Sequence, residues 1–136
     1  MFGGCSFNLN KNYTGLFIGR EEWNYINIGF QFWEKDRELV YGVSIKPQFN
    51  ERRPMEIPLE LRESLRRLPN NSPKNNNWWP WYNYMDQPYR NWSKPEAYKA
   101  IFDGSMKRVI LEKINMILDM TRGLNQLEMS FSNIIL

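Results

Sequence analysis

Two segments in the first third of the chain alternate side chains with a period of two, which is the pattern of a half-buried β-strand. In residues 25–33 one face carries Ile26, Ile28, Phe30 and Phe32, and the other carries Asn27, Gly29, Gln31 and Trp33. In residues 39–45 one face carries Leu39, Tyr41, Val43 and Ile45, and the other carries Val40, Gly42 and Ser44. The charged residues 34–38 suit an exposed hairpin loop, and a weaker strand precedes them at residues 15–18. These segments predict an antiparallel β-meander of about three strands.

Helical patterns begin after Pro47. Pro58 suits the first turn of a helix, in which leucines recur at i, i+4 and i+7 until Pro69. Residues 70–77 are polar and rich in turn residues, so they predict a loop. This loop leads into a tryptophan-rich stretch that we expect to connect the helix with the C-terminal part.

Two further helices are predicted in the last third of the chain. Ser93 and Glu96 match the S-x-x-E capping box, and the Asp-Gly pair at residues 103–104 predicts where this short helix ends. Ser105 can cap a longer helix, whose apolar stripe should pack on the sheet. The stripe consists of Met106, Val109, Ile110, Ile114, Ile117 and Leu118.

These patterns predict one α+β domain over residues 1–136. Its parts are a β-meander at 1–46, a basic helix and Trp-rich connecting loop at 47–92, C-terminal helices packed on one face at 93–127, and a tail at 128–136. The tail alternates loosely, so it either adds an edge strand or frays. A chain of this length can bury most of its apolar surface in a single core.

The composition excludes several kinds of chemistry. The chain has no His, so it cannot form a Ser-His-Asp triad or a His-ligated metal site, and its single cysteine, Cys5, cannot form an internal disulfide. The N-terminal residues lack the apolar core of a secretory signal, and no stretch has the roughly 18 apolar residues of a membrane span. We therefore expect a cytoplasmic protein with no membrane partner.

Carboxylates cluster at residues 34–38, where a magnesium or acid–base site could form. These negative charges alternate with the positive charges of Lys35 and Arg37, however, so a solvated charged turn is the preferred interpretation. No lysine in the chain has an acidic residue two positions before it, so the D/E-x-K metal-nuclease motif is absent. Glycine-rich phosphate loops are absent too, and we expect no catalytic residue, no metal and no cofactor.

Two neighbouring segments are candidates for binding a partner. Residues 46–74 hold seven Lys and Arg against four Asp and Glu, a net charge of +3. They could meet phosphates or an acidic protein, although a solvated helix of mixed charge is the simpler alternative. The aromatic stretch that follows could stack bases or anchor a protein, and we expect at least half of its rings to close over the core. The candidate residues are Arg52, Arg53, Arg62, Arg66, Arg67, Lys74, Trp78, Trp79, Trp81, Arg90 and Trp92.

Four motifs, taken in order, resemble the C-terminal region of bacterial PD-(D/E)XK nuclease family proteins. They are the I-G-F-Q-F of residues 28–32, the V-Y-G-V of 40–43, the W-W-P-W-Y of 78–82 and the N-W-S-K-P-E of 91–96. In that family the catalytic carboxylates and lysine lie upstream of this region. The resemblance therefore implies an accessory domain without the catalytic core, and it assigns no catalytic residue here.

The leading hypothesis is a non-catalytic binding protein that acts on a nucleic-acid-processing complex or on its RNA or DNA. One version is a phage or mobile-element inhibitor of a bacterial nuclease system such as a CRISPR effector. The alternatives are a partner subunit of a split PD-(D/E)XK-type nuclease, and a diverged metal-dependent nuclease that would use Glu34, Asp36 or Asp86. The sequence leaves open whether the partner is RNA, DNA or a protein surface.

Overall fold

A computed structural model describes residues 5–6, 14–33, 38–46, 78–119, 124–125 and 128–129. The strands are β1 (Cys5–Ser6), β2 (Gly15–Ile18), β3 (Ile26–Trp33), β4 (Glu38–Ile45) and β5 (Trp81–Tyr84), and the helices are α2 (Pro95–Phe102) and α3 (Ser105–Leu118). The predicted helix between Pro58 and Pro69 and the loop at 70–77 lie outside the described residues. The α+β class is confirmed.

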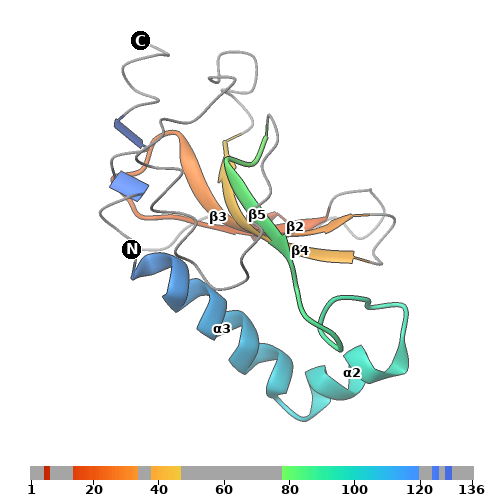
Figure 1. Cartoon of the computed structure of the whole chain (residues 1–136). Helices are drawn as coiled ribbons and strands as arrows, with labels where there is room; N and C mark the ends of the chain where they lie inside the picture. Colours follow the sequence, from red (N-terminus) through yellow and green to blue (C-terminus); the bar gives the residue numbers. More distant parts are fainter. Residues whose placement is uncertain are drawn as a thin grey trace.

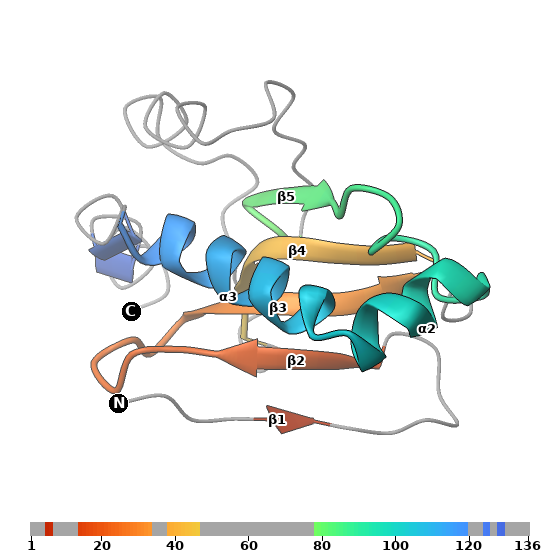
Figure 2. The ribbon, with the colours of Figure 1, turned by 90° about the horizontal axis from the view of Figure 1, so that it is seen from below.

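The strands form one antiparallel sheet in the order β1-β2-β3-β4-β5 (Figures 1 and 2). The meander was expected from the alternating pattern, but the described sheet has five strands, where about three were predicted. One addition is β1, which is only two residues long. The other is β5, which lies within the stretch predicted to be a connecting loop. Aromatic side chains favour strands, and pairing with β4 satisfies the backbone groups of this segment.

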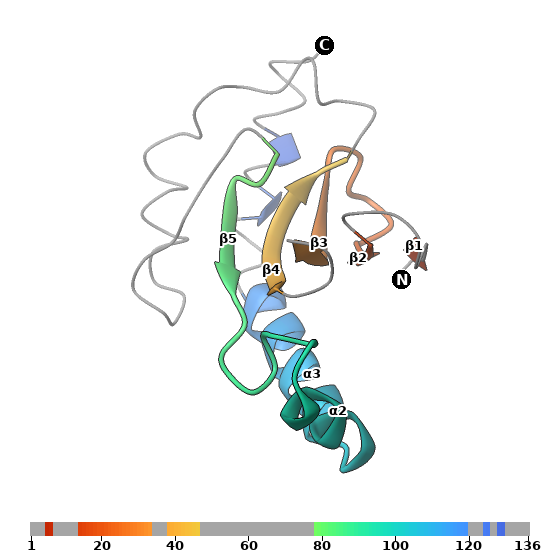
Figure 3. The same cartoon turned by 90° about the vertical axis from the view of Figure 1, so that its right-hand side faces the viewer.

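Helix α3 runs across one face of the sheet, as Figures 2 and 3 show. Its Ile114 and Ile117 are buried in a cluster with the apolar face of β3 and β4, so the predicted packing of the stripe is confirmed. Met106, at the start of α3, instead packs against Ala97 and Ala100 of α2. The stripe therefore holds the helix pair together at one end and covers the sheet along the rest.

The first residues of α2 and α3 differ from those expected from the predicted capping residues, because of the local backbone conformation. Lys94 precedes Pro95 and adopts the extended conformation that a residue before proline favours, so α2 cannot begin at the predicted capping box. Ser93 donates through its backbone N–H and its hydroxyl to Oδ1 of Asn91, at 3.0 and 2.6 Å. Gly104 ends the turn with a φ of +84° and is the residue before α3. The predicted stop is thus confirmed, whereas Ser105 is the first helical residue and not a cap.

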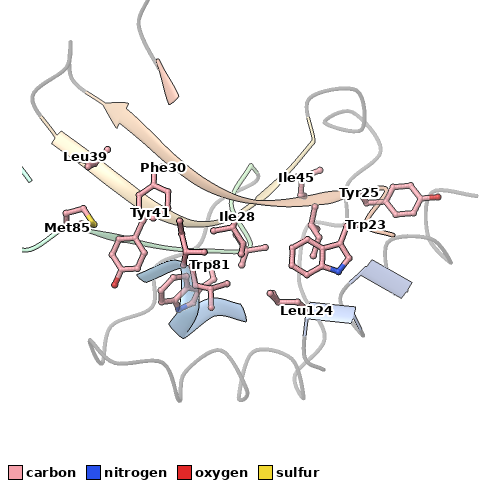
Figure 4. Packing of buried hydrophobic residues seen from close by; sticks show 14 residues of the cluster. Trp23, Tyr25, Ile28, Phe30, Leu39, Tyr41, Ile45, Trp81, Met85 and Leu124 are labelled. Atoms are coloured by element: carbon pink, nitrogen blue, oxygen red, sulfur yellow. The ribbon is translucent and has the colours of Figure 1, made fainter. Parts of the chain in front are cut away.

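The core cluster extends along the whole helix-covered face (Figure 4). Trp81, Tyr41 and Met85 lie toward one end of it, and Trp23 and Leu124 lie at the other. The rings of Tyr41 and Trp81 meet edge to face with centres 5.6 Å apart. Trp23 and Leu124 are 2% and 1% exposed, so a residue beyond α3 belongs to the same core as the strands.

Glu128 is attached to the beginning of β3 by its buried carboxylate. Glu128 is 7% exposed, and its two oxygens accept hydrogen bonds from three consecutive backbone N–H groups, those of Asn24, Tyr25 and Ile26. The bonds from Tyr25 measure 2.8 and 3.0 Å and the bond from Ile26 measures 3.1 Å. Nearby, Nε1 of Trp23 donates to Oδ1 of Asn125 at 2.9 Å. Residues 128–129 are helical and do not form the edge strand considered for the tail.

Candidate binding surface on the sheet

The sheet face away from α3 carries a group of aromatic rings. The strand register places Phe17, Gly29, Gly42 and Tyr82 side by side across four strands. Gln31, Val40 and Tyr84 form the next row. Trp33 lies one row further along, and Trp79, just before β5, contacts both Phe17 and Trp33. We call Phe17, Trp33, Trp79, Tyr82 and Tyr84 the aromatic face.

Two facing glycines, Gly29 and Gly42, allow the close approaches on which the aromatic face depends. A Cβ atom on Gly29 would lie 2.7 Å from the Trp79 ring and 3.0 Å from the ring of Phe17. A Cβ atom on Gly42 would lie 2.2 Å from the carbonyl oxygen of Trp81. Real Cβ atoms do not approach other atoms so closely, so these two positions require glycine. The bare backbone of Gly29 lets Trp79 settle onto the sheet, where it is 4% exposed, and that of Gly42 lets the backbone of β5 approach β4.

Trp33 is the centre of the aromatic face. Its ring centre lies 4.9 Å from that of Tyr82, 6.1 Å from that of Tyr84 and 6.2 Å from that of Trp79. The indole N–H donates to Oε1 of Gln31 at 2.8 Å, which fixes the ring within its own strand. Aromatic pairs at these distances each contribute about 0.5–1.5 kcal/mol beyond the area they bury. The rings therefore stabilise one another in a fixed arrangement.

The aromatic face is partly open to solvent. Phe17, Trp33, Tyr82 and Tyr84 are all half-buried, in contrast to the fully buried rings beneath α3. Burial and the neighbouring Tyr84 raise the pKa of Tyr82 above its ordinary value. The surface thus presents flat apolar rings that carry tyrosine hydroxyl groups.

Arg90 adds a cation to the edge of this surface. Its guanidinium carbon lies 4.1 Å from the ring centre of Tyr84, a stacking distance at which the cation and the ring attract each other. Nε of Arg90 is also paired with Oε2 of Glu38, the first residue of β4. Its backbone oxygen accepts a bond of 2.8 Å from the N–H of Leu39. Arg90 is therefore fixed at the sheet edge, with its side chain 37% exposed.

The tryptophans predicted as one site are divided between the two faces of the sheet. Trp79 belongs to the aromatic face, and Trp78 beside it is 48% exposed. Trp81 is 1% exposed in the main core, on the opposite face from Tyr82 and Tyr84, because neighbouring side chains of a strand alternate. Trp92 is half-buried on the helix side, where its ring meets Phe32 at 4.7 Å. Trp81 and Trp92 therefore do not belong to the aromatic face.

The predicted cations Arg52, Arg53, Arg62, Arg66, Arg67 and Lys74 lie outside the described residues. Ile45 and Trp78, which stand on either side of their segment in the sequence, are nevertheless close together. The N–H of Ile45, at the end of β4, donates to the carbonyl oxygen of Trp78 at 2.9 Å. Ile45 and Trp78, the described residues near the two ends of the 47–77 segment, are therefore close together beside Trp79.

The residues predicted from the sequence did not include Phe17, Trp33, Tyr82 and Tyr84 of the aromatic face, nor Gln31, which holds the Trp33 indole. A signal for two of them was present, because Gln31 and Trp33 fall on the face of residues 25–33 that also carries Gly29. What was missing was the partner strand that brings Tyr82 and Tyr84 to the same face. With β5 taken as a loop, no register could join the two segments.

The described residues hold no group of three His, Cys, Asp or Glu side chains that could bind a metal ion. Of the acids considered for a diverged nuclease, Glu34 and Asp36 lie outside the described residues. Asp86 is exposed, 3.8 Å from Nζ of Lys113. In the part of the chain that is described, no helix has the length and apolar character needed to cross a membrane. No family model, curated protein or solved structure matches this chain.

Proposed function

We propose that this protein is a non-catalytic nucleic-acid-binding protein that holds a single strand against the aromatic face. The observation that carries the proposal is the set of half-buried rings around Trp33, placed on the sheet face that neither α2 nor α3 covers. Every base has a flat π-surface, so a platform of fixed rings can stack bases with little sequence preference. Antiparallel sheets with aromatic faces are a recurring solution for single-stranded RNA.

The charges near the platform support a nucleic acid over an uncharged ligand. Arg90 stacks on Tyr84 at the sheet edge, where it could also reach a phosphate. Ile45 and Trp78, which stand on either side of the basic segment, are hydrogen-bonded to each other beside the rings, and the chain connects them through the seven Lys and Arg residues of 46–74. Stacking rings joined to a basic segment would contact the bases and the backbone of the same strand.

The proposal is tested by fluorescence anisotropy with labelled single-stranded RNA, single-stranded DNA and duplex DNA. We expect single strands to bind more tightly than the duplex. Trp33→Ala and Tyr84→Ala should each weaken binding about 5- to 150-fold, the range expected from a lost stacking contact of 1–3 kcal/mol. Tyr98→Ala is the matched control, since Tyr98 is a 52% exposed ring on α2, away from the sheet.

A salt titration separates the contributions of rings and cations. Each phosphate contact contributes about −0.7 to the slope of log K against log salt for a single strand. Replacing Arg62, Arg66 and Arg67 by Gln should flatten this slope, whereas Trp33→Ala should lower the affinity and leave the slope unchanged. Equal affinities of the wild type and both ring variants for every strand tested would refute the proposal.

Strand binding could either lower or raise the cleavage activity of a nuclease complex. A protein that occupies the strand on its own would lower cleavage when it is added to a nuclease complex, as expected of an inhibitor. A subunit that delivers the strand to a split nuclease would raise cleavage. A cleavage assay with and without the protein distinguishes the two, and Trp33→Ala should abolish either effect.

A further inference from the structure

Helix α2 turns its large apolar side chains outward and its small ones inward. Ala97 and Ala100 are buried against Met106 of α3. Phe102 is 90% exposed and Tyr98 is 52% exposed, although both are larger and more hydrophobic than the buried alanines. An isolated globular protein gains more by burying the aromatic side. This inverted pattern is typical of a helix whose outer side contacts a partner.

The outward residues form one continuous ridge. Tyr98, Ile101 and Phe102 are spaced i, i+3 and i+4, so they are neighbours on the helix surface. Ile101 is 40% exposed. This is the spacing with which an amphipathic helix fills a hydrophobic groove on another protein. We call these three residues the α2 ridge.

The ridge is held in place before any partner arrives. The backbone turn before α2 is fixed by Nε1 of Trp92, which donates to the carbonyl oxygen of Tyr89 at 2.8 Å. After α2, the N–H of Ser105 donates to Oδ1 of Asp103 at 2.8 Å, which closes the turn into α3. Figures 1 and 3 show α2 at the extremity of the molecule, beyond the sheet. Docking would therefore require little ordering of this helix.

The charges around the ridge indicate the character of the partner. Lys99 lies three residues before Phe102 on the outward side of α2 and is exposed. Lys99 and Arg108 both lower the pKa of Asp103, after its bonds with Ser105, which places the two cations close to the residue that follows Phe102. Lys94, just before α2, and Lys107 on α3 are exposed as well. Residues 94–108 thus hold four cations against the two acids Glu96 and Asp103, and this net charge of +2 favours a partner with carboxylates around an apolar groove.

We propose that the α2 ridge is a protein-docking surface that inserts into an apolar groove bordered by Asp and Glu side chains on a different protein. This surface is separate from the aromatic face, so one chain could hold a strand and a protein together. The proposal does not depend on nucleic-acid binding. It would stand if the oligonucleotide experiments failed.

The test places a photoreactive benzophenone amino acid at position 102 of the full chain in cells of its source organism. Cross-linked peptides are then mapped by mass spectrometry, and the captured protein is purified for binding measurements. We expect cross-links in an apolar groove lined by carboxylates. Phe102→Asp should weaken binding about 30-fold or more, as for an aromatic hot spot, and Lys99→Glu with Arg108→Glu should weaken it further at low salt.

Met129→Asp is the matched control, because Met129 is 65% exposed and follows Glu128, which is bonded to the backbone at the start of β3 and not to α2. It should leave the affinity unchanged. Phe102 is nearly free of protein contacts, so its replacement should preserve the fold, which circular dichroism would verify. Cross-links to a second copy of this chain, to a groove without carboxylates, or to no protein at all would overturn the proposal.

Discussion

Removing the Glu128 carboxylate should destabilise the protein through the backbone it caps. Glu128→Ala leaves three N–H groups without their acceptor. Asn24 is exposed, so water can replace the lost partner there, whereas Tyr25 and Ile26 are 8% and 0% exposed. Each unsatisfied buried donor costs about 1–3 kcal/mol, so we expect the two donors to cost about 2–6 kcal/mol of unfolding free energy. Glu128→Gln keeps one acceptor oxygen and should lose about half as much.

Chemical denaturation followed by circular dichroism measures the loss. Hydrogen exchange locates it, since the amides of Tyr25 and Ile26 should exchange faster in Glu128→Ala than in the wild type. Glu112→Gln is the matched control, because Glu112 is exposed on α3 and its replacement should change stability by less than about 0.5 kcal/mol. A Glu128→Ala variant as stable as this control would refute the capping role.

The stability of the wild type relative to Glu128→Gln should also depend on pH. Burial raises the pKa of Glu128 above its ordinary value of 4.5, although the three amides and Lys46 oppose this shift. The folded chain therefore takes up a proton at a higher pH than the unfolded chain. Wild-type stability should rise relative to Glu128→Gln as the pH falls from neutral through the folded pKa, and level off below 4.5. If the difference in unfolding free energy between the wild type and Glu128→Gln became smaller on acidification, the expected direction of the pH dependence would be wrong.

Three further substitutions test the packing. Gly42→Ala would place a methyl group 2.2 Å from the carbonyl oxygen of Trp81, so it should detach β5 and weaken oligonucleotide binding together with stability, measured by anisotropy and thermal melting. Gly104→Ala meets no atom within 4 Å but must adopt a φ of +84°, so it should cost about 1–2 kcal/mol in a denaturation curve and leave binding unchanged. Trp81→Phe removes a buried indole N–H that has no hydrogen-bond partner among the described residues. Removing this unsatisfied donor should offset part of the stability lost with the smaller ring, so a denaturation curve should show a loss below about 2 kcal/mol.

Local patterns predicted those parts of the fold in which one side of an element had to be buried. Ile28 and Val43 face α3 because the period-two alternation leaves no other arrangement that buries both apolar rows. Ile114 and Ile117 follow from helical spacing in the same way. The Asp-Gly stop was also visible in the sequence, because few residues other than glycine adopt the positive φ that this turn requires.

The candidate surface could not be predicted in the same way, because it joins residues that are distant in sequence. Trp33 and Tyr82 belong to strands that are not neighbours in the sheet, and both β3 and β5 pair with β4. A short aromatic run is compatible with a loop or with a strand. The sequence alone therefore did not show which of its rings share a face. The position of Glu128 was likewise hidden, since a lone carboxylate carries no signal for amides more than 100 residues earlier.

By itself, the sequence determined which side chains share a face of each strand and helix, because that depends on backbone periodicity alone. It also excluded histidine chemistry, because the residue is absent. Only the tertiary structure decided which tryptophans are core and which form a surface. That outcome depends on the register of β5 against β4 and on the space above two glycines, and both are properties of strands brought together by folding.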